Sequence, residues 1–424
     1  MSELLFKNAR IIDPARNIDQ IGDIAVADGV IVDPGKLNSP EVIDLTGKIL
    51  SPGFIDVHVH LRQPGNTTAE TIASGSAAAA AGGFTSIVAM PNTSPSADTA
   101  GAIEYLRRIA AEQAVVKVLP CGNMTKGGKG EEMAGIGSLK SAGVVALSDD
   151  GKCIQDHGLM RHVVEYAKSF ELPILDHCEE STLASGGVMN EGKWSVLLGM
   201  HGIPGAAEEL IIARNIIFAR QINWRIHMQH VSTRDSVDMI RRARAKGIPV
   251  TGEATPHHLS LTDENVKKFD TNYKMNPPLR TEDDRQALIE GIVDGTITVI
   301  ATDHAPHTET AKLVEFDHAP FGIIGLETAL PVCFTQLVAS GVITVDKLIP
   351  KLTTGPAEVL GIKNYSLAEG NAADITVFDP QAEYVIDKSK FRSKSRNTPF
   401  DGMTVRGKIN LTVVDGKIVY REGC

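Results

Sequence analysis

Apolar residues occur along this chain in short runs, and what separates the runs changes twice. In roughly the first fifty residues, Pro, Gly and Asp separate the runs LLFKNARIID, DIAVADGVIV and EVIDLTGKIL. Such runs are typical of short strands joined by turns. Roughly the last sixty residues are similar, with DITVFDP, YVIDKSKF and INLTVVDGKIVY, and the Asp415–Gly416 pair predicts a tight hairpin.

From about residue 53 to residue 356 the spacing is different. Runs of strand length, among them TSIVAM, VVKVLP, GVVALSD, LPILDH, WRIHMQH, IPVTGEA and ITVIATDH, alternate with longer helical stretches rich in Ala, Leu and charged residues. This alternation indicates parallel βαβ units, and about seven or eight units in about 300 residues match a (β/α)8 barrel. A doubly wound open sheet is the competing fold, but no G-x-G-x-x-G follows the first strand.

We therefore expect an α/β protein of two domains, for which 424 residues are sufficient. The (β/α)8 barrel comprises residues 53–356. Residues 1–52 and 357–424 form one small β-sandwich-like domain, which requires the two ends of the chain to meet in space.

Composition and charge exclude several classes of function. The 42 basic and 52 acidic residues give a formal net charge of -10, so there is no basic footprint for nucleic acid or an anionic membrane. No apolar run approaches the roughly 18 residues that span a bilayer, and no signal segment begins the chain. The five cysteines are odd in number and lack paired spacing, which suits free thiols. We expect a soluble cytoplasmic protein.

Most predicted strands of the central region end at a residue that can bind metal. His58 and His60 follow the apolar run that begins at Phe54, and their i, i+2 spacing places both side chains on one face of a strand. The other strand ends carry Asp149, Asp150, His177, His230 and Asp303. Active sites of (β/α)8 barrels lie at the carboxyl ends of the strands, so these distant residues can meet there.

Each residue also has an ordinary structural explanation. A single histidine such as His177 is more often a hydrogen-bonded buried side chain than a ligand, and Asp149 and Asp150 precede a glycine, as turn residues do. His227 lies three positions before His230, so in a strand only one of them points into the site. Four histidines and two aspartates at independent strand ends nevertheless indicate a metal site.

Six such ligands are too many for one tetrahedral zinc ion. They suit two ions about 3.5–4 Å apart, with a carboxylate and a hydroxide between them. Such ions lower the pKa of the bridging water and polarise the carbonyl group under attack. Asp303 would be the general base and acid, taking a proton from that water and passing it to the departing nitrogen. We expect one or two divalent ions per chain, with zinc as the metal.

These residues and the motifs around them resemble the bacterial dihydroorotases of the amidohydrolase superfamily. The resemblance covers nearly the whole chain and includes GFIDVHVHLRQPG, MPNTSP, SDDGK, DHCEE, TPHHL, NPPLR, TDHAPHT, PFGIIGLET, TGPAEVLG and EGNAADITVFD. It implies an enzyme that interconverts N-carbamoyl-L-aspartate and L-dihydroorotate, the ring-closing step of pyrimidine biosynthesis. The metal ligands it implies are His58, His60, Asp150, His177, His230 and Asp303.

The resemblance also implies substrate contacts. These are Arg62, Asn92, Asn276, His307 and backbone donors near Phe321 and Gly322. We expect Arg62 to continue the alternation of His58 and His60, which places its guanidinium beside the metal, where it can bind the ring carboxylate in a bidentate manner. Without the two histidines before it, Arg62 would be assigned to a surface salt bridge. Without the family pattern, Asn92 and Asn276 would be assigned to turns beside proline.

The chain departs from the family pattern in the strand that often supplies a bridging ligand. Many amidohydrolases bridge their metals with a carbamylated lysine, but this strand has Ala146–Leu147, with Lys140 and Lys152 outside it. The chain resembles the subgroup in which an aspartate bridges, here Asp150. Two further features concern the barrel mouth. Gln63 stands where glutamate is common, and the polar segment 307–322 is either a lid or a long loop.

Two other functions stay open. An allantoinase or hydantoinase would share the metal site, but its substrate lacks a ring carboxylate to balance Arg62. A catalytically silent homologue beside aspartate transcarbamoylase would be expected to have lost metal ligands, whereas all six are present. The expected partners are a small-molecule substrate and further copies of the chain in a homo-oligomer. Association with aspartate transcarbamoylase stays open.

Overall fold

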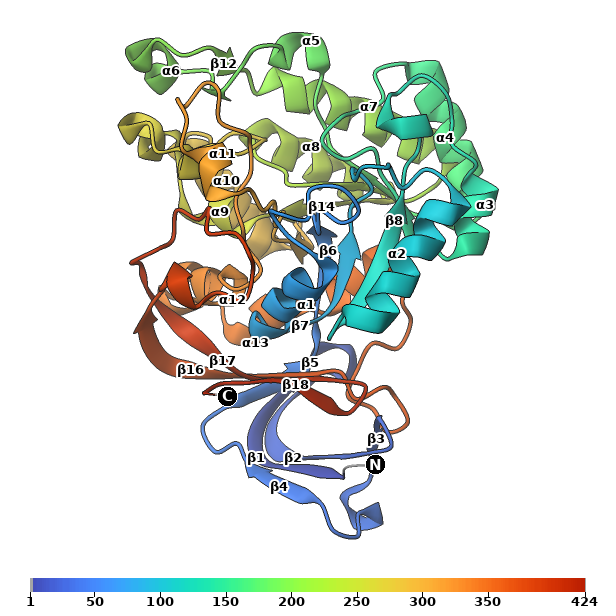
Figure 1. Ribbon diagram of the computed structural model, residues 1–424, viewed down its shortest axis with the longest axis vertical. Coiled ribbons are helices and arrows are strands. Elements are labelled where there is room, and N and C mark those ends of the chain that lie inside the picture. The colour runs from blue at the N-terminus through green and yellow to red at the C-terminus, as the bar shows by residue number, and fades with distance from the viewer. Residues whose placement is uncertain (1–2, 424) are drawn as a thin grey trace.

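Eight parallel strands form the barrel that the sequence predicts (Figure 1). The computed structural model describes residues 3–423. The barrel strands are β6 (Phe54–Val59), β7 (Phe84–Ala89), β8 (Lys117–Gly122), β9 (Ala146–Leu147), β10 (Ile174–Asp176), β13 (Ile226–Met228), β14 (Val250–Ala254) and β15 (Val299–Ile300). Neighbours in this order pair in parallel. The backbone N–H of His60 donates to the carbonyl oxygen of His304 at 2.9 Å, so the segment after β15 returns to β6. The (β/α)8 barrel is confirmed.

Helices connect the strands and cover the outside of the barrel (Figure 1). The longer ones are α1 (Ile72–Ala81), α2 (Ala100–Gln113), α3 (Ile136–Ala142), α4 (His157–Ser169), α7 (Ala206–Ile222), α8 (Arg234–Ala245), α10 (Glu282–Asp294), α13 (Val345–Leu352) and α14 (Thr354–Leu360). The shorter ones are α5 (Ser181–Ala184), α6 (Lys193–Leu198), α9 (Pro256–Ser260), α11 (Glu309–Lys312) and α12 (Ala329–Cys333). α1, α2, α8 and α10 each follow a threonine whose side chain accepts from a backbone N–H of the first turn. These caps help to fix where each strand-to-helix loop ends.

Strands from both ends of the chain form one sheet beside the barrel (Figure 1). In spatial order they are β18 (Lys417–Arg421), β17 (Thr404–Val414), β16 (Ile375–Val385), β5 (Ile49–Pro52), β1 (Leu4–Asp13), β2 (Ile18–Ala27) and β3 (Val30–Val32), and β4 (Glu41–Asp44) pairs with β1. β5 and β16 are antiparallel, with Pro52 opposite Ile375. The two terminal segments thus meet, as the strand pattern predicts. The domain limits and the sandwich-like packing stay predictions.

One predicted turn is confirmed and one predicted strand is wrong. Asp415–Gly416 joins β17 to β18, and both residues have positive φ, 46° and 75°, as a two-residue hairpin of the primed type requires. YVIDKSKF is not a separate strand, because Tyr384–Val385 ends β16 and Lys388–Lys390 forms a 3-10 turn. The side chain of Asp387 accepts from the backbone N–H of Ser389, which competes with sheet pairing.

The terminal sheet takes part in two apolar cores. One is its own and includes Leu4, Phe6, Val26, Leu50, Val377 and Val413. The other is the large core of the barrel and its helices, which Ile49, Phe378 and Ile409 of the sheet join. Another cluster joins residues of the barrel strands, such as Ile55, Val57 and Val299, to Ala357 and Leu360 of α14. Side chains just beyond residue 356 therefore pack against the barrel.

The cysteines and the helices agree with two expectations from composition. Cys121, Cys153, Cys178 and Cys333 are buried free thiols, whereas Cys424 lies outside the described residues. Within residues 3–423, no helix combines the length and the apolar character that crossing a membrane requires.

Candidate metal centre and substrate site

The six predicted ligands lie at the carboxyl ends of the barrel strands, and all are buried. His58 is in β6 and His60 directly follows it. The other four follow β9, β10, β13 and β15 within three residues; they are Asp150, His177, His230 and Asp303. Their assignment as ligands stays a prediction.

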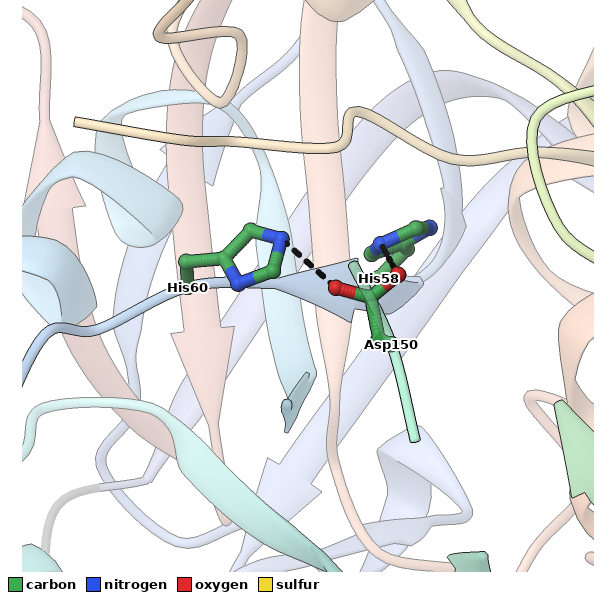
Figure 2. A group of neighbouring side chains, drawn as sticks. All are labelled: His58, His60 and Asp150. Atoms are coloured by element: carbon green, nitrogen blue, oxygen red, sulfur yellow. Dashed lines mark ion pairs between the residues drawn. The ribbon is translucent and has the colours of Figure 1, made fainter. Parts of the chain in front are cut away.

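Asp150 lies between His58 and His60 (Figure 2). Its Oδ1 atom is 3.2 Å from Nε2 of His58, and its Oδ2 atom is 3.3 Å from Nε2 of His60. The same two Nε2 atoms lie 3.5 Å and 3.1 Å from Oδ1 of Asp303. Two imidazoles thus face two carboxylates, which is a donor set suited to a divalent metal ion.

Asp150 also belongs to a second group, with His177 and His230. Nδ1 of His177 is 3.8 Å from Oδ1 of Asp150 and 2.8 Å from Nε2 of His230. In each group of three, the candidate ligand atoms lie within 4.8 Å of one another. Because the Asp150 carboxylate is common to both groups, it has the position that a bridging ligand between two ions needs.

The outer ring nitrogens of His58 and His60 already have partners. Nδ1 of His58 is 2.7 Å from Oε1 of Glu253, and Nδ1 of His60 is 2.9 Å from Oδ1 of Asn92. Since both partner oxygens are acceptors, each Nδ1 carries a proton, and in the neutral form of each ring Nε2 presents a lone pair. These lone pairs face the carboxylate of Asp150. Lone pairs and a carboxylate repel each other, so a cation between the imidazoles and the carboxylate would stabilise the site.

The buried histidines and carboxylates of the site change one another's pKa values. Burial alone would lower the pKa of His58, but Asp150 and Asp303 raise it well above its usual value. Burial alone would raise the pKa of Asp150, but His58 and His60 hold it well below its usual value. Burial also lowers the pKa of His230 well below its usual value, which leaves the neutral imidazole that metals bind. The site therefore favours positive charge beside its carboxylates.

The residues fit a divalent metal. Nε2 of His58, Nε2 of His177 and Nδ1 of His230 are buried and have no hydrogen-bond partner within residues 3–423. Buried polar atoms without a partner are rare because they cost free energy. Neutral imidazoles and carboxylates together are ligands that zinc and related ions prefer.

Arg62 approaches the site by a different route from the predicted one. β6 ends at Val59 and Arg62 has a φ of 58°, so the residue does not continue the strand alternation, and that prediction is wrong. Nε of Arg62 donates to the carbonyl oxygen of Pro306 at 3.1 Å, and Nη2 lies 3.5 Å from Nε2 of His307. Burial lowers the pKa of Arg62, and the negative charge of Asp303 opposes this effect. The guanidinium is therefore near the candidate metal centre.

Asn92 and Asn276 hold other residues of the site. Nδ2 of Asn92 donates to Oδ2 of Asp150 at 3.2 Å. Nδ2 of Asn276 donates at 2.8 Å to Oε2 of Glu179, which in turn lies 3.9 Å from Nε2 of His177. Oδ1 of Asn276 is buried and unpaired among the described residues. An unpaired acceptor at this place suits an N–H group of a ligand.

The remaining predicted contacts lie in the segment 307–322. Nε2 of His307 donates to the carbonyl oxygen of Phe321 at 2.7 Å. The backbone N–H of Gly322 already donates to the carbonyl oxygen of Lys274 at 2.9 Å, so a substrate would have to replace this bond. The segment contains α11, where Nζ of Lys312 donates to the carbonyl oxygens of Thr271, Lys274 and Pro320. These bonds attach the segment to the barrel loops.

Two carboxylates near the candidate metal ligands are not among the residues predicted from the sequence. Glu253 of β14 contacts His58, and Glu179 lies beside His177 in the DHCEE motif. A glutamate inside the apolar run IPVTGEA is a signal that could have identified Glu253, because buried charges are rare unless paired. His227, which contacts Glu253, belongs to neither candidate group, so the expectation that only one histidine of its pair faces the site is confirmed.

The residues flanking Asp150 have other roles. Asp149 accepts hydrogen bonds from the backbone N–H groups of Met124 and Thr125, and so it supports a neighbouring loop. Lys140 and Lys152 are exposed. The absence of a lysine from β9 itself leaves Asp150 as the bridging candidate.

Comparison with known proteins assigns the chain to a family. A family model described as dihydro-orotase-like matches residues 47–236. The chain is 49% identical over 422 residues to a curated dihydroorotase of Thermoanaerobacter sp. (strain X514), with 99% of this chain and 97% of the relative covered. It is 49% identical over 420 residues to a dihydroorotase of Solibacter usitatus (strain Ellin6076), with 98% of each covered. The chain belongs to the dihydroorotase family.

Solved structures of related enzymes share the fold of this dihydroorotase family member. An L-hydantoinase from Arthrobacter aurescens has a TM-score of 0.90 and 26% identity, covering 100% of this chain and 97% of its own. A dihydropyrimidinase from Brevibacillus agri has a TM-score of 0.87 and 25% identity, covering 99% and 95%. Identity to the dihydroorotases is nearly twice as high. As a member of their family, the protein is a metal-dependent cyclic amidohydrolase.

Proposed function

We propose that the protein catalyses the reversible cyclisation of N-carbamoyl-L-aspartate to L-dihydroorotate and water, a step of pyrimidine biosynthesis. The observation that carries this proposal is the convergence of four histidines on Asp150, with Asp303 beside two of them, in a chain of the dihydroorotase family. A catalytically silent role is disfavoured because no candidate ligand has been lost. A hydantoinase role is disfavoured by the lower identity to the hydantoinases and by the partly buried guanidinium of Arg62 near the metal centre.

The candidate ligands would hold zinc, with two ions sharing the Asp150 carboxylate; they are His58, His60, Asp150, His177, His230 and Asp303. When bound, divalent metal polarises the carbonyl group under attack and makes water nucleophilic near neutral pH. Asn92 supports this arrangement, since it contacts both His60 and Asp150. Asn92 would hold the imidazole of His60 and the carboxylate of Asp150 in a fixed relative position.

Asp303 would move the proton. In hydrolysis its carboxylate takes a proton from the attacking water and passes it to the ring nitrogen as the amide C–N bond breaks. In ring closure it takes the proton from the ureido nitrogen and returns it to the departing water. Support comes from its place at the centre, 3.1 Å from Nε2 of His60, and from its side-chain exposure of only 9%.

Arg62 would pair with the ring carboxylate of the substrate. Its guanidinium is largely enclosed, and such a charge needs an anionic partner. The unpaired Oδ1 atom of Asn276 would accept an N–H of the ring. His307 and the backbone at Phe321 and Gly322 would complete the contact surface once the internal bonds of this segment have been exchanged for bonds to substrate.

We also propose that the protein is cytoplasmic and forms a homo-oligomer. The buried free thiols suit a reducing compartment. Val196 and Leu197 of α6 and Leu210 of α7 are 80%, 64% and 55% exposed, and exposed apolar side chains are typical of contact surfaces. Light scattering would give the number of subunits. The same measurement with added aspartate transcarbamoylase would test the association that stays open.

The proposed function is tested with purified protein and its metal content. We expect hydrolysis of L-dihydroorotate at alkaline pH and its formation from carbamoyl aspartate at mildly acidic pH. Chelation should abolish both, and added zinc should restore them. Full activity in metal-free protein, or a preference for hydantoin over dihydroorotate, would contradict the proposal.

A further inference from the structure

One buried carboxylate touches residues from both halves of the candidate metal centre. Oε1 of Glu253 lies 2.7 Å from Nδ1 of His58 and accepts the backbone N–H of His230 at 3.1 Å. His58 belongs to the first candidate group and His230 to the second. Glu253 itself belongs to neither group, and its side chain is fully buried.

The second oxygen of Glu253 is held from the opposite side. Oε2 lies 2.9 Å from Nε2 of His227, and Nδ1 of His227 lies 2.8 Å from Oγ1 of Thr251. Since a carboxylate only accepts, Nε2 of His227 carries the proton and Nδ1 accepts from the Thr251 hydroxyl. His227, which belongs to neither metal group, therefore donates to the second oxygen of Glu253.

The contact with Glu253 holds the ring of His58. With its proton on Nδ1 facing Glu253, the ring presents Nε2 to Asp150, as Figure 2 shows. The backbone bond to His230 acts at a residue with a φ of 31°, in the left-handed region, just after β13. An unusual backbone conformation persists only where the surroundings hold it.

We propose that Glu253 is a positioning residue for both halves of the metal centre. The same oxygen of its carboxylate fixes the ring of His58 in the first group and the backbone of His230 in the second. The inference rests on the proposed metal site, which it deepens. Hydrogen bonds of this kind to a ligand typically change metal affinity by about 10-fold to 100-fold. Here one residue affects both ions.

The proposal predicts a specific order among substitutions. Glu253→Met keeps the length of the side chain but removes the acceptor, so both ions should bind about 10-fold to 100-fold more weakly. Glu253→Gln should bind them nearly as well as the wild type. Its amide oxygen can take the place of Oε1, and its NH2 group can donate to His227, once that ring moves its proton to Nδ1 and donates to Thr251.

The measurement is metal affinity, read independently of turnover. Apoprotein is titrated with zinc against a chromophoric chelator to obtain both affinities, and the visible spectrum of the cobalt-loaded protein reports ligand geometry. Glu327→Met is the matched control. Glu327 is a partly buried carboxylate that accepts backbone N–H bonds from Arg392 and Ser393, but it contacts no candidate ligand. Its variant should keep wild-type affinities.

Several outcomes would overturn the proposal. Wild-type affinity of Glu253→Met for either ion would show that the residue does not set both halves. Equal loss in Glu253→Gln and Glu253→Met would show that its charge, not its position, matters. If Glu253→Met does not fold, Glu253→Asp replaces it. Aspartate is one methylene too short for all three contacts, so both ions should again bind about 10-fold to 100-fold more weakly. Failure of the protein to hydrolyse dihydroorotate would leave these affinities measurable, so the two proposals fail separately.

Discussion

Nε2 of His60 lies 3.1 Å from Oδ1 of Asp303, although 243 positions separate the two residues in the chain. The first barrel strand carries His60 at its end, and the last carries Asp303. They meet because the segment after β15 pairs with the end of β6 and closes the barrel. Closure therefore supplies a carboxylate to the histidine pair.

Asp303→Asn tests the proton-transfer role. The amide keeps the shape of the side chain but has no basic carboxylate, and general acid–base catalysis contributes roughly a hundredfold to ten-thousandfold. We expect kcat to fall in this range while the thermal midpoint stays close to the wild-type value. The measurement is steady-state hydrolysis of dihydroorotate beside thermal unfolding, with metal content checked in both proteins. Near-wild-type turnover would move the proton transfer to another residue.

Asp150→Ala tests the bridge between the two groups. Asp150 contacts His58 and His60 through different oxygens and also approaches His177. Its loss should lower the metal content per chain. Added bicarbonate should not restore metal or activity, because Lys140 and Lys152 are exposed and β9 contains no lysine to carbamylate. Activation of the wild-type enzyme by bicarbonate would instead indicate a lysine carbamate.

The sequence predicts most of the barrel and the ligand set, for definite reasons. Strand-length runs that alternate with helical stretches specify βαβ units and therefore a parallel sheet. In a barrel the carboxyl ends of the strands converge regardless of the conformation of the loops. The pair His58 and His60 follows from the period of a strand. β9 and β15 have only two paired residues each, so their ends are less well predicted.

Residues held by loops or by contacts across the barrel could not be predicted in this way. The route of Arg62 depends on where β6 ends and on a positive φ, which periodicity does not report. Glu253 and His58 lie on strands that are not neighbours, so only the closed barrel makes them partners. The hydrogen bond from the Gly322 N–H to the carbonyl oxygen of Lys274 depends on how two loops pack against each other.

His307→Gln tests a pH dependence of stability. Burial and the charge of Arg62 lower the pKa of His307 to about 3, against about 6.5 in an unfolded chain. Between these values the unfolded chain binds the extra proton, so the stability contributed by the neutral ring is lost as the pH falls. We expect the wild type to lose stability more steeply than the variant from about pH 7 to about pH 5. Urea unfolding of both apoproteins measures this, and equal slopes would contradict it.

Arg62→Met separates dihydroorotase activity from that of the related hydantoinases. If the guanidinium binds the ring carboxylate, its removal leaves a substrate charge without a partner in an enclosed site, which costs more than the loss of a neutral contact. Hydrolysis of L-dihydroorotate should therefore weaken strongly. Dihydrouracil has the same ring without the carboxylate, so any activity towards it should change little. The informative quantity is the ratio of the two kcat/KM values, because damage to the metal centre cancels in it.

Arg62 also donates to the carbonyl oxygen of Pro306, and a purely structural role would lower both values equally. An unchanged ratio would therefore assign Arg62 to support of the loop after Asp303 and would favour a hydantoinase-like specificity.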